Sequence, residues 1–158
     1  VWAGLIFDAA GRTGEAGEQY RRLLEIHPGE SRVIRELIVH YLRSGEYQQA
    51  ADLLEPVLQG AEGMEHWSEN LRTLETRAAT LREIADWEWV RFLYGPDLAA
   101  LAGDKDHALE LLELWSSDDW SSDERLLHPH ILAVYVLNPG LRSEPRFRQR
   151  LEEMGVSW

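Results

Sequence analysis

The sequence repeats a pattern of aromatic, glycine and alanine residues after 34 positions, and this repeat limits the fold more than any other feature. A fixed period of this length is typical of stacked helical units, each of which buries its apolar face against the next. The matched pairs are Phe7 and Tyr41, Gly11 and Gly45, Ala16 and Ala50, Tyr20 and Leu54, Leu23 and Val57, and Leu24 and Leu58.

Each repeated residue type has a physical role in a pair of helices. We expect the aromatic residue to fill the space between the two helices, and the glycine to allow a tight turn with positive φ. The alanine marks the closest approach of the helices, where a larger side chain would force them apart. Pro28 should end the first unit, because the residue before a proline rarely remains helical.

A third copy of the pattern follows after a longer interval, with Gly103, Ala108 and Leu112 in the equivalent positions. The intervening apolar residues recur at steps of four and three, which predicts one long helix over residues 64–94, roughly 45 Å long at 1.5 Å per residue. Gly95 and Pro96 should end that helix. A short helix over 97–102 would then pair with a helix over 105–115.

The stripe on the predicted long helix has two interpretations. It is either a seam that pairs with a second copy of the chain, or a face that packs against the neighbouring hairpins. The residues of the stripe that would carry self-association are Trp67, Leu71, Leu74, Ala78 and Leu81.

The last part of the chain is predicted to be a loop followed by a closing helix. Residues 116–124 form an acidic polar stretch, and the run 131–137 is either a short buried helix or an extended strap. Ser143 is a suitable N-cap for a final helix with Glu144 and Pro145 in its first turn. Phe147, Leu151 and Met154 would form its apolar face.

The 34-residue spacing resembles the tetratricopeptide repeat. The first unit has Ala3 at the position of the family leucine, and the second has Ile38 at the family glycine and Glu62 at the proline. The residues in the register of that family are Gly4, Phe7, Ala16, Tyr20 and Pro28 in the first unit, and Leu37, Tyr41, Gly45 and Ala50 in the second.

The end of the chain is similar to the segment that closes tetratricopeptide regions of bacterial regulatory proteins. The similarity rests on Gly103, Asp104, Ala108 and Leu109, and on Leu141, Arg142, Ser143, Pro145, Arg146, Phe147, Leu151, Met154 and Gly155. It implies a sensory or interaction array next to an output domain. The chain begins without methionine and in an apolar pattern, which suggests a piece of a longer protein.

We therefore predict an all-α fold: a tetratricopeptide-like solenoid of helical hairpins with a long central helix and a C-terminal capping helix. Within a single domain, the first repeat would span 1–30 and the second 31–62. The long helix and a divergent third repeat would span 64–116, and the loop and cap 117–158.

The charge of the chain argues against nucleic acid as a partner. The net charge is −12, and residues 61–125 hold 6 Lys and Arg against 16 Asp and Glu. That stretch is either a solvated helix surface or a surface for a basic partner. The longest uncharged run, 126–141, is interrupted by two prolines and too short to span a bilayer. No signal peptide is visible, so we favour the cytoplasm without assigning a compartment.

The sequence offers little for catalysis. His128 and His130 lie beside a proline without an evident third metal ligand, and no nucleophile elbow, phosphate loop or dinucleotide fingerprint occurs. We predict a protein that is not an enzyme and that needs no metal and no cofactor.

The resemblance implies that the first helix of each hairpin lines a concave groove for a peptide or protein partner. Arginines near an aromatic ring would bind a carboxylate there, although Val39 replaces the asparagine of the family's carboxylate clamp and Arg35 stands for its basic residue. The predicted groove residues are Trp2, Leu5, Asp8, Arg32, Arg35, Val39 and Arg43, with Glu36, Leu42, Val90, Leu93, Tyr94 and Asp97 as further members.

Overall fold

The computed structural model describes residues 2–59, 61–91, 94–113 and 139–155, and every element in these ranges is a helix. The first hairpin consists of α1 (Trp2–Ala9) and α2 (Thr13–Ile26), and the second of α3 (Ser31–Ser44) and α4 (Tyr47–Val57). Within each pair the helices pack together, and α2 packs on α3. The helix α2 ends before Pro28, as the sequence predicts.

The repeated glycines and alanines have the roles predicted for them. Gly11 and Gly45 have φ angles of 72° and 77° in the turns that connect the paired helices. Ala16 and Ala50 are completely buried in the hydrophobic core. The 34-residue pattern therefore marks the positions of turns and of close contacts between helices.

The prediction of one long helix over 64–94 is wrong. The segment forms α5 (Trp67–Arg72), α6 (Leu74–Ala85) and α7 (Glu88–Arg91), and Thr73 between α5 and α6 has an extended backbone with φ −98° and ψ 126°. Side chains from α6 cap the end of α5, because Arg77 Nε donates to Leu71 O at 2.8 Å and Thr76 Oγ1 donates to Asn70 O at 2.8 Å. These bonds satisfy carbonyl groups that the continuing helix would have paired.

The break also divides the stripe that was predicted as a seam for a second copy of the chain. α5 packs against α6, and Trp67 meets Trp87 edge to face with ring centroids 5.0 Å apart. Of the five stripe residues, Trp67, Leu71 and Leu81 are buried in the core, while Leu74 and Ala78 are exposed. Three of the five residues therefore pack within one chain, as in the second interpretation of the periodicity.

The third copy of the pattern forms the hairpin that was predicted. The helix α8 (Gly95–Leu101) begins at the Gly-Pro pair and packs against α9 (Lys105–Glu113). Gly103 has a φ of 85° in the connecting turn, and Ala108 is completely buried. An ion pair between Arg43 of α3 and Asp97 belongs to the contact that brings α8 against the second hairpin.

The chain closes with α11 (Pro139–Ser143) and α12 (Pro145–Glu153). The N-cap of α12 is Glu144 rather than the predicted Ser143, because Ser143 is the last residue of α11 and Glu144 takes the extended conformation that favours the position before a proline. Phe147 and Leu151 are completely buried, as expected for a cap.

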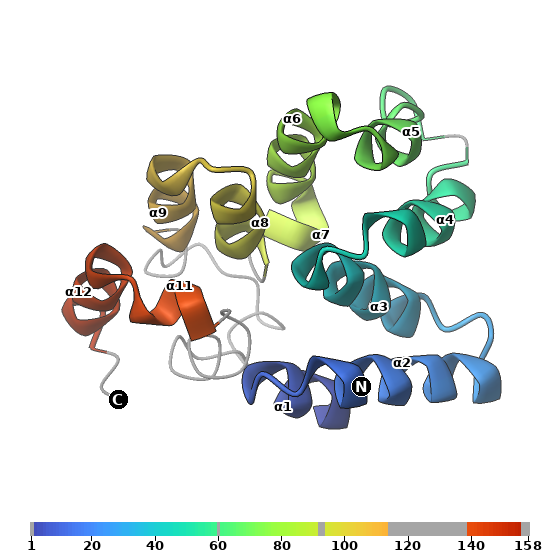
Figure 1. The fold of residues 1–158 in the computed structure, drawn as a ribbon, viewed down its shortest axis with the longest axis horizontal. Coiled ribbons are helices and arrows are strands. Elements are labelled where there is room, and N and C mark those ends of the chain that lie inside the picture. Colours follow the sequence, from blue (N-terminus) through green and yellow to red (C-terminus); the bar gives the residue numbers. More distant parts are fainter. Residues whose placement is uncertain (1, 60, 92–93, 114–138, 156–158) are drawn as a thin grey trace.

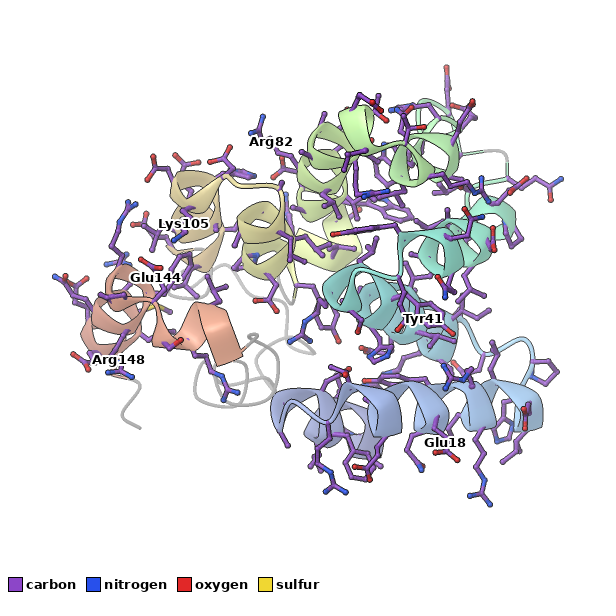
Figure 2. The ribbon with its side chains drawn as sticks, viewed as in Figure 1. Glu18, Tyr41, Arg82, Lys105, Glu144 and Arg148 are labelled. Atoms are coloured by element: carbon purple, nitrogen blue, oxygen red, sulfur yellow. The ribbon has the colours of Figure 1, made fainter. Side chains whose placement is uncertain are left out.

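Ion pairs join this cap to α9. Lys105 Nζ lies 2.9 Å from Glu144, and Figure 2 shows the two side chains between the two helices. Arg146 lies 2.7 Å from Asp106. The acidic stretch 116–124, the run 131–137 and the two histidines at 128 and 130 lie outside the described residues.

The helices follow one another around an arc, from α1 and α2 through α4 and α5 to α9 and α12 (Figure 1). Elements adjacent in sequence pack on each other, and one continuous core of Leu, Ile, Val, Ala and aromatic residues runs through the array. The prediction of an all-α solenoid of helical hairpins is therefore confirmed. No described helix has the length and apolarity needed to cross a lipid bilayer.

Candidate partner-binding face

The predicted groove residues of α3 lie on one side of that helix, at steps of three and four residues. Their exposure differs. Arg32 is exposed and Arg35 is partly buried, whereas Val39 is 1% exposed and the side chain of Arg43 is 8% exposed. On α1, Trp2 is 54% exposed, while Leu5 and Asp8 are buried. The structure therefore leaves Trp2, Arg32 and Arg35 accessible, a set that we call the Trp2–Arg32 patch.

The guanidinium of Arg32 lies 5.7 Å from the centre of the Trp2 ring, which is within the range of a cation–π contact. The two residues come from the first helices of two successive hairpins, so the contact joins the two repeats at the surface. The patch offers a flat apolar ring beside the cationic side chain of Arg32, with Arg35 three residues further along α3. Such a combination can bind an apolar side chain and a carboxylate at the same time.

Beneath this surface Asp8 is held by groups of the protein itself. Its Oδ1 lies 2.8 Å from His40 Nδ1, and its Oδ2 accepts a hydrogen bond of 3.3 Å from the Tyr20 hydroxyl. Asp8 and His40 are both buried. A buried carboxylate with these partners joins the first hairpin to α3 and is not accessible to a ligand.

Glu36 of α3 accepts a hydrogen bond from the hydroxyl of Tyr94, at the start of α8. Burial raises the pKa of Glu36, and the nearby Asp8 acts in the same direction, whereas Tyr94, Arg32 and Arg35 act against them. Burial also raises the pKa of Tyr94 well above its ordinary value, so the phenol remains a hydrogen-bond donor.

Arg43 forms an ion pair with Asp97 of α8, with 3.0 Å between Nε and Oδ2. The Asp97 side chain is 1% exposed, so both charges are removed from water. Arg142 of α11 lies close by and donates to the Ala9 carbonyl at 2.8 Å. Burial lowers the pKa of Arg142, while the charge of Asp97 raises it.

The interior therefore contains a polar cluster that five parts of the fold share: α1, α2, α3, α8 and α11. Arg43 was predicted to bind a carboxylate of a partner, but it binds the Asp97 carboxylate of its own chain. Sequence reasoning missed His40, Tyr20 and Arg142 as members of the cluster. The sequence contained one signal for the cluster. Arg43 and Asp97 have opposite charges, and both were predicted to lie on the first helices of their units.

No group of three or more His, Asp or Glu side chains among residues 2–59, 61–91, 94–113 and 139–155 has the geometry of a metal site. The carboxylates of the cluster, Asp8, Glu36 and Asp97, are buried and paired with other groups of the protein. What remains accessible on this side of the array is the Trp2–Arg32 patch.

Comparison with known protein families supports the interpretation of the repeats. Residues 9–67 match the model of the family described as "Tetratricopeptide repeat". This match supports a tetratricopeptide-repeat protein, and it begins in the first hairpin and ends at the start of α5. No curated protein and no solved structure matches the chain.

Proposed function

We propose that the chain is a non-enzymatic protein-interaction module that binds a segment of another protein at the Trp2–Arg32 patch. Tetratricopeptide repeats generally mediate interactions between proteins, and residues 9–67 match that family. The observation that carries the proposal is the exposed Trp2 ring with Arg32 against it, at the junction of two repeats.

The chemistry of the patch specifies the kind of segment. Trp2 provides apolar area, and Trp and Arg are the residues that most often dominate binding energy in protein interfaces. Arg32 and Arg35 favour a carboxylate near the apolar side chain, because charge-assisted hydrogen bonds to arginine are strong and directional. The expected ligand is a peptide segment with Asp or Glu beside an aromatic or aliphatic residue.

A displayed peptide library selected on the purified chain tests the proposal. We expect enrichment of peptides with an acidic residue next to an apolar one. Synthetic copies should bind Trp2→Ala and Arg32→Ala about tenfold more weakly or worse, since each change removes a residue of the kind that costs more than about 1 kcal/mol in interfaces.

Matched controls come from α2, where Arg22 and Ile26 are exposed. Arg22→Ala removes the same charge and Ile26→Ala a comparable apolar group, both from side chains that do not belong to the patch. Both variants should bind the selected peptides as the unchanged chain does. Equal weakening in the patch and control variants would refute the site.

Self-association through residues 64–94 stays a prediction with less support, because three of the five seam residues are buried within the chain. A regulatory role beside an output domain in a bacterial protein, implied by the similarity of the last helices, is part of the proposal. In that setting, the bound segment would be the signal that the array transmits.

A further inference from the structure

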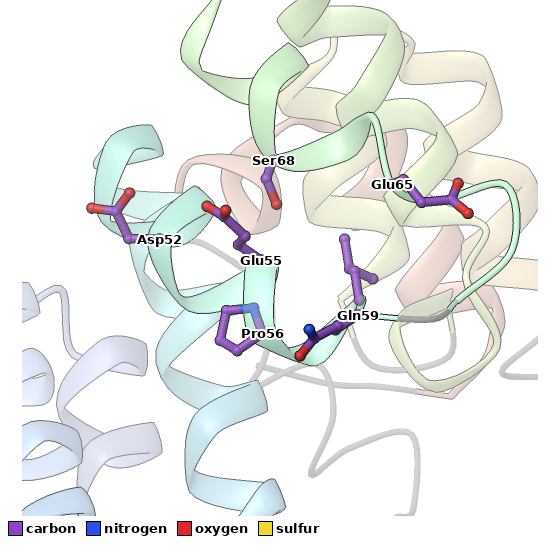
Figure 3. Close-up of a pocket in the computed structure, with 7 residues that line it drawn as sticks. Asp52, Glu55, Pro56, Gln59, Glu65 and Ser68 are labelled. Atoms are coloured by element: carbon purple, nitrogen blue, oxygen red, sulfur yellow. The ribbon is translucent and has the colours of Figure 1, made fainter.

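A second surface feature lies away from the Trp2–Arg32 patch. A pocket of about 590 Å³ opens between α4 and α5, which pack against each other. Figure 3 shows its residues around an open space between the end of α4 and the start of α5. Its lining includes Asp52, Glu55, Pro56, Leu58, Glu65 and Ser68.

The pocket lies in a part of the described chain where acidic residues are not balanced by basic ones. Between Arg43 and Arg72 the sequence contains no Lys or Arg, while six carboxylates occur: Glu46, Asp52, Glu55, Glu62, Glu65 and Glu69. Arg72 at the rim reaches Asp52 at 2.7 Å and Glu55 at 3.3 Å. Glu65, on the other side, has no ion pair or hydrogen bond to any described residue, so negative charge remains uncompensated at the mouth.

A buried hydroxyl faces the same space. Ser68 is 5% exposed, and its Oγ has no hydrogen-bond partner within the described part of the chain. Figure 3 shows the side chain projecting from α5 towards α4, on the side where Glu55 lies. Buried polar atoms are nearly always paired in native proteins, so a hydroxyl without a partner in the wall of a pocket indicates a missing hydrogen-bonding group.

An organic cation has the chemistry to supply this group. A metal ion does not fit, because no three carboxylates or histidines of the described residues converge on one point. Pro56 and Leu58 form an apolar part of the wall, which suits the methylene stem of a long side chain. An ammonium or guanidinium group at the end of such a stem would donate both to Ser68 Oγ and to carboxylates at the mouth.

We propose that the α4–α5 pocket binds a lysine or arginine side chain from a basic segment of a partner protein. The volume exceeds that of one side chain, so residues on either side of the cation also find room along Glu55 and Glu65. This binding does not depend on the Trp2–Arg32 patch, because the pocket shares no residue with it.

The test uses a fluorescently labelled tetra-arginine peptide, with tetra-lysine and tetra-glutamine peptides as comparisons, followed by fluorescence anisotropy at low ionic strength. We expect binding of the two basic peptides and none of tetra-glutamine. Glu65→Gln and Glu55→Gln should each weaken binding by about tenfold, since each removes a charge-assisted hydrogen bond.

Ser68→Ala is the most informative variant, because it leaves the net charge unchanged. It removes a buried hydroxyl without a partner, so the variant should fold and show an unchanged or higher melting temperature. Its affinity for tetra-arginine should nevertheless fall severalfold. A role of Ser68 in stability alone would leave the affinity as it is.

Glu25→Gln on α2 and Glu152→Gln on α12 are the charge-matched controls, since both carboxylates are exposed and lie on other helices. They should retain the affinity of the unchanged chain, as should Trp2→Ala, which disables the other proposed site. If the controls lose as much affinity as Glu65→Gln, binding is diffuse attraction to an acidic protein and the pocket is refuted. An unchanged affinity in Ser68→Ala also overturns the proposal.

Discussion

At the scale of single residues, Gly4 packs directly against the ring of Tyr20 in the first hairpin. A Cβ atom at position 4 would lie 2.5 Å from two atoms of the Tyr20 ring. The ring cannot move away easily, because it is completely buried and its hydroxyl donates to Asp8. Gly4 is therefore required for packing, although glycine is a poor helix former.

We predict that Gly4→Ala lowers the free energy of unfolding by about 1–3 kcal/mol, because overpacking outweighs the gain in helix propensity. Gly14→Ala on α2 is the matched control, since a Cβ there meets nothing within 4 Å. It should stabilise the chain by up to about 1 kcal/mol. Urea denaturation measures both, and a stabilising Gly4→Ala would show that the contact with Tyr20 is not formed.

Glu36 gives the chain a pH dependence that can be isolated. Because burial raises its pKa in the folded state, the folded chain binds the proton more tightly than the unfolded chain does. Its contribution to stability is therefore complete below the unfolded pKa of about 4.3 and is lost as the pH rises through the folded value.

Glu36→Gln keeps the side chain neutral at every pH and still accepts the hydrogen bond from Tyr94. We expect the variant to gain stability relative to the unchanged chain as the pH rises from about 4 towards 8. Urea denaturation at several pH values measures this difference, with the exposed Glu25→Gln as control. A stability difference that does not change with pH would contradict the raised pKa.

At the scale of the helices, the break at Thr73 shapes the middle of the array. Arg77 maintains it, since Nε donates to Leu71 O and Nη2 to Arg72 O at 3.4 Å. The same guanidinium lies 4.2 Å from the centre of the Tyr47 ring, so it also joins α6 to α4.

We predict that Arg77→Met lowers the free energy of unfolding by about 1–3 kcal/mol, because partly buried carbonyl groups lose their donor. Arg82→Met on the same helix is the control. Arg82 pairs with Asp104 while its side chain is 53% exposed, so its loss should cost less than about 1 kcal/mol. Equal costs for the two variants, measured by thermal or urea unfolding, would mean that Arg77 does not cap α5.

The hairpins could be predicted from the sequence because each small residue of the repeated pattern has a single structural role. Glycines 11, 45 and 103 occupy turns with positive φ, and Ala16, Ala50 and Ala108 mark close contacts, so their spacing locates the helices. The break at Thr73 could not be predicted in this way. Leu71 and Leu74 continue the apolar steps across it, and the groups that stabilise it come from the next helix.

The candidate site was predictable in part for the same reason. Helical register put Arg32, Arg35 and Arg43 on one side of α3, and the structure agrees. Register does not indicate which of these side chains another helix covers. The helix α8 buries Arg43, while Arg32 remains exposed. This difference depends on the path of residues 67–91, for which the sequence prediction was wrong.

At the scale of the whole molecule, the arc of hairpins brings α8 against α3 and places an ion pair between them (Figure 1). A single straight helix over 64–94 would have carried α8 away from the second hairpin. The contact buries Arg43 and leaves the Trp2–Arg32 patch, the proposed surface for a partner, accessible on this side of the array.

The coupling energy between Arg43 and Asp97 tests this arrangement most directly. In a double-mutant cycle of Arg43→Met and Asp97→Asn, followed by urea denaturation, each single change should cost about 3 kcal/mol because it leaves a buried charge without its partner. The coupling energy should be about 2 kcal/mol, against less than about 1 kcal/mol for the exposed pair of Arg82 and Asp104. Additive effects of the two changes at 43 and 97 would contradict the contact between α3 and α8, and with it the proposed shape of the binding face.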